Sequence, residues 1–325
     1  MKDWSIDDTH PLAPAGTGAG KALAGSGRSG PTPGPSTANP STTAVRFDVA
    51  GLSDKGAVRD ENQDHFLVVR TGRYFQTLAT SLPAGEVPER SEEQGLLMMV
   101  ADGMGGQAAG EVASRTVLAT LTNLILEHPE WILKVDEESA SDLLKRTIAR
   151  YRALDFALAE RMDADPTLRG MGTTLTVAYS LGLDLFVAHV GDSRAYVLHD
   201  GAVRQLTRDH TYMQNLVYAT MLSREEAAGH ELRNVLTNVL GGAHRSVEVE
   251  FQRLRLAAGD RLLLCSDGLT GPVKDEEIAA VLGASVSASE CSRRLVDRAL
   301  ALGAPDNVTV IVARYELSGS PSGAP

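Results

Sequence analysis

The chain has 325 residues, 43% hydrophobic and 22% charged, a composition typical of a soluble globular protein. Its net charge of −11, from 31 Lys and Arg against 42 Asp and Glu, excludes a general attraction to nucleic acid or to anionic lipid. Two cysteines are too few for a disulfide framework. No apolar run reaches the roughly 18 residues of a membrane span, and the first residues lack a signal-peptide pattern. We therefore predict a cytoplasmic protein with no membrane or nucleic-acid partner.

The two ends of the chain differ in composition from the middle. Residues 11–43 are almost all Gly, Pro, Ser, Thr or Ala and cannot bury enough apolar surface to offset the entropy of ordering them. We predict a disordered tail over 1–43, a folded domain over 44–317 and a second short disordered tail over 318–325. The long tail is either a passive extension or a docking or modification segment.

The middle of the chain alternates between strand and helix patterns. In chain order, the predicted strands are 45–52, 66–70, 96–101, 173–179, 185–190, 195–198, 247–251, 261–265 and 308–313, and the predicted helices are 108–127, 139–162, 275–282 and 288–302. Short turns at Asp184 and at 199–201 link consecutive strands as hairpins do. Because strands outnumber helices and are often hairpin-linked, the pattern favours an α+β fold with two sheets flanked by helices over a doubly wound parallel sheet.

Aspartates recur at the ends of the predicted strands. Two strands run directly into Asp-Gly steps, at 102–103 and 267–268, while Asp64 and Asp306 each stand just before a strand. Any one of them is most simply a turn former. Strand ends converge in space, however, and converging carboxylates repel unless a cation neutralises them. All-oxygen ligands favour hard cations such as Mg²⁺ or Mn²⁺, which activate water for attack on a phosphoryl group.

Six short motifs carry a family resemblance. They are, in order, RDENQD at 59–64, DGMGG at 102–106, GTT at 172–174, GDSR at 191–194, SDG at 266–268 and PDN at 305–307. Together they resemble the metal-dependent Ser/Thr protein phosphatases (PPM family, type 2C class), specifically their bacterial branch. The resemblance covers roughly residues 47–315. It implies two packed antiparallel β-sheets flanked by α-helices on both outer faces, an α-β-β-α sandwich.

The resemblance also implies the ligands of two tightly bound metals. Asp102 is expected to bridge the two metals, and the Gly103 carbonyl to help ligate one of them. Asp267 and Asp306 are expected to complete the other metal site.

Three further roles follow from the resemblance. Asp64 is expected to hold metal-bound waters rather than the metal itself, and Asp192, with Asp267, to bind a third, looser metal. Arg59 is expected to hold the substrate phosphate, for which its planar guanidinium is suited.

The implied activity is hydrolysis of phosphoserine and phosphothreonine in proteins by a water that two Mn²⁺ or Mg²⁺ ions activate. The implied partners are phosphorylated proteins, namely substrates of Ser/Thr kinases and the kinases themselves, in a signalling role for a monomeric enzyme. The alternative is a catalytically weak phosphatase-fold protein that acts as a regulatory or binding module. A lost metal aspartate or a lost Arg59 would mark that alternative, and neither is lost.

The sequence departs from some relatives at two positions. Met104 stands where many eukaryotic members carry a histidine thought to protonate the leaving alkoxide, so the general acid is unassigned and a metal-bound water is the default. Gln63 stands where some members carry glutamate, which removes one charge near a metal.

Three other chemistries match the sequence only nominally. Residues 103–108 fit a G-x-G-x-x-A dinucleotide fingerprint, but Asp102 would lie beside the pyrophosphate and the expected ribose-binding acid would fall inside a helix. Residues 163–167 imitate the D-x-D-x-T of aspartyl-phosphate phosphatases, yet they follow a helical pattern, so a helix-ending turn is favoured. Neither Cys265 nor Cys291 is followed six residues later by Arg, so both are interpreted as buried small hydrophobes. His189, inside an apolar strand, is interpreted as a core residue.

Residues 211–242, the flap segment, carry none of the metal carboxylates. A capping box at 223–226 predicts a short helix, and Met213, Tyr218 and Met221 are adaptable apolar groups. The matching region of the family is a mobile flap over the metal site. The segment is either such a flap, which selects protein substrates, or a plain helical connection packed on the core.

Overall fold

The computed structural model describes residues 45–83, 86–87, 89–106, 109–127, 137–223, 226–227, 229–242 and 247–317. The predicted tails at 1–43 and 318–325 lie outside the described residues. All described residues belong to one compact unit, Thr42–Pro325.

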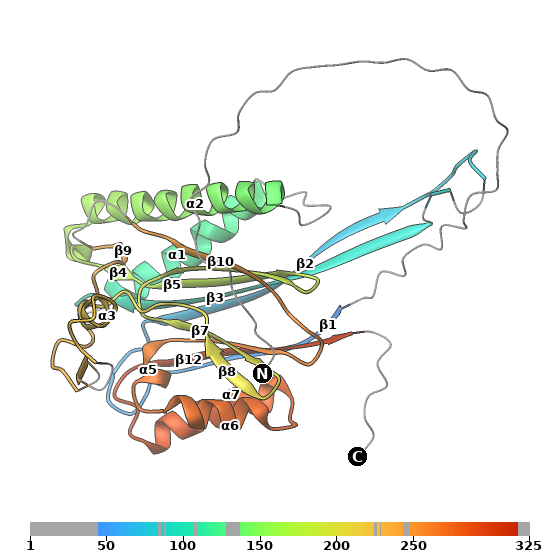
Figure 1. Cartoon of the computed structure of the whole chain (residues 1–325). Coiled ribbons are helices and arrows are strands. Elements are labelled where there is room, and N and C mark those ends of the chain that lie inside the picture. Colours follow the sequence, from blue (N-terminus) through green and yellow to red (C-terminus); the bar gives the residue numbers. More distant parts are fainter. Residues whose placement is uncertain are drawn as a thin grey trace. The chain divides into compact units, whose positions relative to one another are not determined.

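One sheet has five strands, all antiparallel to their neighbours. Its order is β1 (Val45–Asp54), β12 (Val308–Leu317), β11 (Arg261–Cys265), β7 (Arg194–His199) and β8 (Ala202–Gln205). The central strand β11 is buried along its whole length, as its continuous apolar run predicts. Helices α6 (Asp275–Gly283) and α7 (Ala288–Ala301) cover the outer face, with the short α5 (Asp267–Thr270) directly after β11 (Figure 1).

The second sheet is also antiparallel. It runs β10 (Glu250–Arg255), β6 (Asp184–Val190), β5 (Leu175–Leu181), β3 (Arg90–Met104) and β2 (Asp64–Gln76), and the short β4 (Gly172–Thr173) and β9 (Leu240–Gly241) extend it at the end of β3. Helices α1 (Ala109–Glu127) and α2 (Glu137–Ala164) cover its outer face. Two short elements complete the described structure: the 3₁₀ turn η1 (Pro166–Leu168), directly after α2, and the helix α3 (Tyr212–Tyr218), after β8.

Strand β3 shows why the sequence folds into layers. Its run Leu96–Ala101 is apolar without a break, because both faces of the strand are covered. Leu96, Met98 and Val100 point between the two sheets, whereas the alternating Leu97 and Met99 face the helices α1 and α2. The core is therefore three layers of apolar contacts: helices on sheet, sheet on sheet, and sheet on helices.

The expected α-β-β-α sandwich is confirmed, and the differences are local. The predicted strand 173–179 divides into β4 and β5 at Thr174, and β10 begins at Glu250 rather than at Val247. Strand β8 was not predicted as a strand, although the turn before it was. Asp184 is the first residue of β6, paired with Leu181, so that hairpin turns one step earlier than predicted. Within the described part of the chain, no helix has the length and apolar character of a membrane span.

Candidate metal centre

Two of the predicted aspartates face each other across neighbouring strands. Asp64 opens β2, Asp102 lies near the end of β3, and the two are directly paired in the antiparallel register. Side chains paired in this way lie on the same face about 5 Å apart, where like charges destabilise the sheet. This pair alone already favours a bound cation.

The other three aspartates come from both sheets and reach the same place. Asp267 begins α5 directly after β11, and Asp306 precedes β12, the antiparallel neighbour of β11. Asp192 lies in the turn between β6 and β7, where the chain passes from one sheet to the other. The sequence predicted that four of these aspartates converge at strand ends, and the resemblance added Asp192. The structure brings all five carboxylates together at one end of the sandwich.

The electrostatics of the cluster confirm that the carboxyl groups crowd one another. Burial, followed by the charges of Asp64, Asp267, Asp192 and Asp306, raises the pKa of Asp102 well above its ordinary value. Burial is the main cause that raises the pKa of Asp64, to about 7. Hydrogen bonds from the Ser266 and Thr309 hydroxyls lower this pKa, whereas the charges of Asp267 and Asp306 raise it.

The same two causes act on the remaining pair of buried aspartates. Burial first, and then the charge of Asp267, raises the pKa of Asp192. Burial first, and then the charge of Asp306, raises the pKa of Asp267. A cluster that resists ionisation in this way is stabilised by any cation that lets its carboxylates ionise.

The donor set fits a hard divalent cation. Among the described residues, Asp64 Oδ1 and Asp267 Oδ1 are buried side-chain oxygens without a hydrogen-bond partner. Unpartnered buried oxygens are costly, and metal coordination would satisfy them. Five carboxylates with neither His nor Cys among them match the oxygen ligands of Mg²⁺ or Mn²⁺.

Close backbone approach explains the glycine after each of the two aspartates. A Cβ at Gly103 would lie 2.1 Å from the Gly110 carbonyl oxygen, at the start of α1. A Cβ at Gly268 would lie 1.9 Å from the Asn307 carbonyl oxygen, next to Asp306. Both distances are far below van der Waals contact, so the Asp-Gly steps bring the strand ends together as well as turning the chain.

The GTT motif holds the backbone of Asp102. Thr174 N donates to Asp102 O (2.9 Å), and Asp102 N donates to Thr174 Oγ1 (3.0 Å). Thr173 Oγ1 also donates to Asp102 O (2.8 Å). Thr174 Oγ1 lies 2.7 Å from Ser193 Oγ, which connects this strand end to the loop that carries Asp192.

Arg59 lies at the rim of the cluster. Its Nη2 donates to Asp306 Oδ2 at 2.6 Å, and both side chains are partly exposed. This hydrogen bond and the charge of Asp306 raise the pKa of Arg59. The guanidinium predicted to hold phosphate therefore contacts a predicted metal ligand, within reach of an anion bound at the cluster.

Two residues that position the site, Asn307 and Ser266, were not singled out from the sequence. Asn307 anchors the loop that carries Arg59: its Nδ2 donates to Lys55 O (2.8 Å) and Glu61 O (2.9 Å), and its Oδ1 accepts from Gln63 N (2.8 Å). Ser266 Oγ donates to Asp64 Oδ2 (2.6 Å), which joins the two sheets. Both residues stand next to a predicted ligand inside a motif, and that position was the only signal.

The arginine of the GDSR motif has a structural role. Arg194 donates from Nε and Nη2 to the two carboxylate oxygens of Asp209, at 2.8 and 2.6 Å. Its Nη1 donates to the Tyr196 hydroxyl (2.9 Å), which in turn donates to Asp275 Oδ1 (3.1 Å). This chain of hydrogen bonds ties the loop beside Asp192 to the start of α6.

A cavity of about 920 Å³ opens beside the cluster. Its lining includes Asp192, Asp267 and Asp306, together with Met213 and Tyr218 of the flap segment. A second cavity of about 490 Å³ lies between the second sheet and helices α1 and α2, but none of the five aspartates lines it. The chemistry therefore belongs to the first cavity.

The structure supports the rejection of the other chemistries. Burial raises the pKa of Cys265 to about 12, so this thiol stays protonated, and Cys291 is also buried. Asp165 accepts from Thr167 N (3.0 Å) and caps η1, as expected of a turn former. Strand β3 pairs only with antiparallel neighbours among the described strands, unlike the parallel sheet of a dinucleotide-binding fold. Met104, at the end of β3, is 40% exposed.

The chain matches known proteins over most of its folded part. Residues 89–301 match the family model for protein phosphatase 2C. The chain is 40% identical over 272 residues to the serine/threonine protein phosphatase PstP of Mycobacterium tuberculosis; the match covers 84% of this chain and 45% of that protein. The chain thus spans about half the length of this curated relative. It is 32% identical over 266 residues to the serine/threonine phosphatase stp of Listeria monocytogenes, which covers 82% of this chain and 95% of the relative.

Solved structures agree with these matches. The crystal structure of the M. tuberculosis phosphatase PstP/Ppp has a TM-score of 0.67 at 38% identity and covers 84% of this chain and 99% of that one. The PstP catalytic domain in complex with two manganese ions has a TM-score of 0.66 at 37% identity, covering 84% of this chain and 100% of that one. The two-sheet sandwich is thus the fold of solved serine/threonine phosphatases. The chain belongs to the protein phosphatase 2C family.

Proposed function

We propose that this protein is a metal-dependent protein serine/threonine phosphatase, with its catalytic domain over 44–317. The observation that carries the proposal is the cluster of five carboxylates beside a cavity that could admit a phosphorylated side chain. Two of these carboxylates have a buried oxygen that finds no hydrogen-bond partner in the described part of the chain. The relatives named as serine/threonine phosphatases, one of them solved with two manganese ions, support it. The alternative of a catalytically weak binding module is less favoured, because every expected metal aspartate and Arg59 are present.

The expected metal ligands have different roles at the two ions. Asp102 would bridge two Mn²⁺ or Mg²⁺ ions, with the Gly103 carbonyl on one of them and Asp267 and Asp306 on the other. Asp64, the most enclosed of the set, would hold metal-bound waters. Bound cations of this kind lower the pKa of water and neutralise phosphoryl oxygens.

The further roles involve the rim of the cluster. Asp192, together with Asp267, would hold a third, looser ion. Arg59, once Asp306 is engaged by a cation, would be free to hold the substrate phosphate through its planar guanidinium.

The chain itself supplies binding and orientation rather than a covalent intermediate. Both cysteines are buried, and no Ser or His of the six motifs is placed as a nucleophile. We therefore infer direct attack by water: a new P–O bond forms as the bond to the Ser or Thr oxygen breaks. Met104 cannot donate a proton, so the leaving alkoxide takes its proton from water.

The substrates and setting are also part of the proposal. The substrates would be proteins phosphorylated by Ser/Thr kinases of the same cell, and the kinases themselves, in a cytoplasmic signalling role for a monomeric enzyme. Phosphoproteomic comparison of a deletion strain with its parent would identify them as phosphosites whose occupancy rises on deletion and returns on complementation.

Metal removal tests the reaction. Hydrolysis of a phosphothreonine peptide should stop in chelator and return with excess Mn²⁺ or Mg²⁺. Chelator-resistant hydrolysis would contradict the proposal.

Substitutions test the roles. Asp102→Ala should abolish activity, because it deletes the shared ligand. Asp192→Ala should mainly raise the metal concentration required. Arg59→Ala should raise KM more than it lowers kcat, if Arg59 binds the ground state and the transition state alike. Equal losses in all three folded variants would contradict this assignment.

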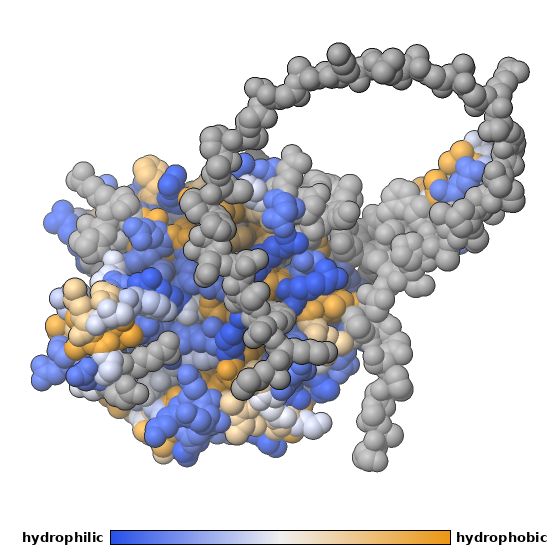
Figure 2. All heavy atoms as spheres, viewed as in Figure 1, coloured by the Kyte–Doolittle hydropathy of each residue, from blue (hydrophilic) through white to orange (hydrophobic). Residues whose placement is uncertain are grey.

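The flap segment is the proposed determinant of substrate choice. Thr211 caps α3 through its side chain, Met213 is buried, and Tyr218 and Met221 are exposed by 50% and 71%. Figure 2 shows apolar side chains gathered over this part of the surface, at the left edge of the view. Ser223 and Glu226 make the reciprocal hydrogen bonds of the predicted capping box.

Shortening the flap segment should change turnover of phosphoproteins but leave hydrolysis of a small aryl phosphate within a few-fold. A parallel loss on both substrates would instead make the segment part of the catalytic scaffold.

A further inference from the structure

His210, the residue just before the flap segment, is bound to the loop that carries Asp192. His210 N donates to Gly191 O at 2.7 Å, and Gly191 N donates back to His210 Nδ1 at 3.1 Å. Gly191 is buried, with φ of +113° and Thr174 packed where a Cβ would stand. The histidine side chain therefore completes a two-way hydrogen bond with the residue next to Asp192.

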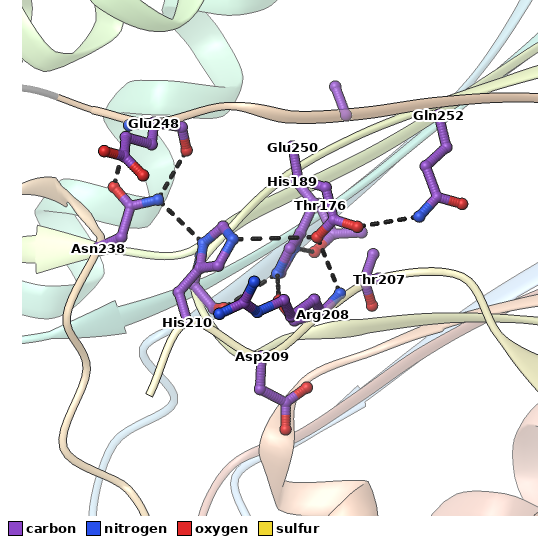
Figure 3. Close-up of polar contacts among 12 residues, drawn as sticks. Thr176, His189, Thr207, Arg208, Asp209, His210, Asn238, Glu248, Glu250 and Gln252 are labelled. Atoms are coloured by element: carbon purple, nitrogen blue, oxygen red, sulfur yellow. Dashed lines mark hydrogen bonds and ion pairs between the residues drawn. The ribbon is translucent and has the colours of Figure 1, made fainter. Parts of the chain in front are cut away.

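The other end of the flap segment returns to the same histidine. Thr237 N donates to His210 O (2.8 Å). Asn238 Nδ2 donates to His210 Nδ1 (2.9 Å), as Figure 3 shows. Asn238 is itself held by Glu248, through Nδ2 to Glu248 O (2.7 Å) and Glu248 N to Oδ1 (3.2 Å). The two ends of the segment thus meet at His210, through its backbone carbonyl and its imidazole.

Three nearby side chains could suggest a transition-metal site, but their hydrogen bonds argue against it. The ligand atoms of His189, His210 and Glu250 lie within 4.8 Å of one another. Two N–H groups point at His210 Nδ1, from Gly191 and Asn238, so this nitrogen carries the lone pair and Nε2 carries the proton.

His189 reaches the same protonation by a different route. Its Nε2 lies 2.9 Å from Gly191 O and 3.1 Å from Arg208 O, so it donates to these carbonyls, and its Nδ1 lies 2.8 Å from Thr176 Oγ1. A metal needs the lone pair of an unprotonated nitrogen. Both Nε2 atoms carry protons instead, and both Nδ1 atoms are already engaged as acceptors. The trio holds the backbone in place.

We propose that His210 is a positioning residue that couples the flap segment to the loop of Asp192. It acts as the single acceptor that fixes Gly191 from one side and Asn238 from the other. A change in the flap is thereby transmitted to Asp192 through two hydrogen bonds to one atom. The inference rests on the proposed function only in giving Asp192 a metal; the hydrogen-bonded connection stands by itself.

The test compares His210→Ala with His210→Asn in the full chain. Alanine removes the acceptor, so the Gly191 amide and the amides of 211–238 should exchange with solvent at least tenfold faster. The Mn²⁺ concentration for half-maximal hydrolysis of a small aryl phosphate should rise several-fold, with kcat at saturating metal nearly unchanged. Asparagine can present its Oδ1 near the position of Nδ1, so it should restore most of the slow exchange and of the metal affinity.

Two further variants separate coupling from general loosening. Asp192→Ala should raise the metal requirement without accelerating exchange in the flap segment. His199→Ala is the matched control. His199, at the end of β7, bonds Asp260, which precedes β11, so the substitution lies outside the site and should move neither readout. If His210→Ala does not fold, Asn238→Ala carries the test and should accelerate exchange chiefly around Thr237.

The results are measured by hydrogen–deuterium exchange and by metal titration. Unchanged hydrogen exchange in folded His210→Ala would overturn the proposal. Exchange in His210→Asn as fast as in His210→Ala would overturn it too. Faster exchange with an unchanged metal requirement would also overturn it, since the flap would then be held without any connection to Asp192. An inactive wild-type protein with the expected exchange changes would contradict the phosphatase function and leave the positioning role of His210 supported.

Discussion

The buried carboxyl group of Asp64 should make the metal-free protein less stable as pH rises. Its pKa of about 7 in the folded state lies above the ordinary 3.8, so between these values the folded protein holds a proton that the unfolded chain releases. This contribution to stability is fully present below about pH 4 and is lost as pH rises through 7. A shift of about 3 units at about 1.4 kcal/mol each costs roughly 4 kcal/mol above pH 7.

The Asp64→Asn substitution isolates this cost. Removing the charge recovers roughly 4 kcal/mol at pH 8. Ser266 donates to Oδ2, so the amide nitrogen would take the place of Oδ1, which has no hydrogen-bond partner among the described residues. An unpaired buried donor costs about 1–3 kcal/mol. The metal-free variant should therefore be more stable than wild type by about 1–3 kcal/mol at pH 8, with Tm raised by about 2–4 °C per kcal/mol.

The assay is thermal or urea unfolding in chelator, followed by circular dichroism at pH 4.5 and pH 8. Asp260→Asn is the matched control, because Asp260 is also buried but accepts from His199 Nδ1 and Ala257 N, both at 2.8 Å. Losing that acceptor should destabilise the control at both pH values. An Asp64→Asn protein less stable than wild type by the same margin at pH 4.5 and pH 8 would refute the reasoning.

Two other perturbations have outcomes fixed by the structure. Gly268→Ala places a Cβ 1.9 Å from the Asn307 carbonyl oxygen and should cost about 3 kcal/mol or more. At Gly283 a new Cβ meets no described atom within 4 Å beyond its chain neighbours and its own helix backbone, so Gly283→Ala should be neutral or stabilising by up to about 1 kcal/mol. Urea midpoints measure both variants, and equal midpoints would contradict the packing argument. Burial, followed by the charge of His210, lowers the pKa of His189 to about 3, so the unfolded chain takes up a proton below pH 6.5 that the folded state refuses. Stability should fall by about 2 kcal/mol from this group between pH 6.5 and 4.5. His189→Asn, compared with wild type in chelator, should remove that part of the acid dependence, and identical pH profiles would contradict the reasoning.

Local patterns in the sequence determined most of the secondary structure. Helices α1 and α6 begin and end within about one residue of their expected bounds, because an apolar stripe of helical period leaves a signature within a few turns. Strand β11 was predicted to the residue, because a short apolar run between polar turns is a local pattern as well. The aspartates at the strand ends, and their order in the motifs, likewise predict a hard-cation site from the sequence alone.

Only the tertiary structure decided which residues from distant segments form hydrogen bonds. Asn307 bonds to a loop almost 250 positions earlier, Ser266 bonds to Asp64 across 202 positions, and neither contact leaves a periodic pattern in the sequence. His189 was expected to be a core residue and is one, but the role of His210 as the common acceptor for Gly191 and Asn238 had no signal in the sequence. Helices and strands depend on residues that are only a few positions apart in the sequence. Hydrogen bonds between distant segments exist only after the sheets have packed and brought those segments together.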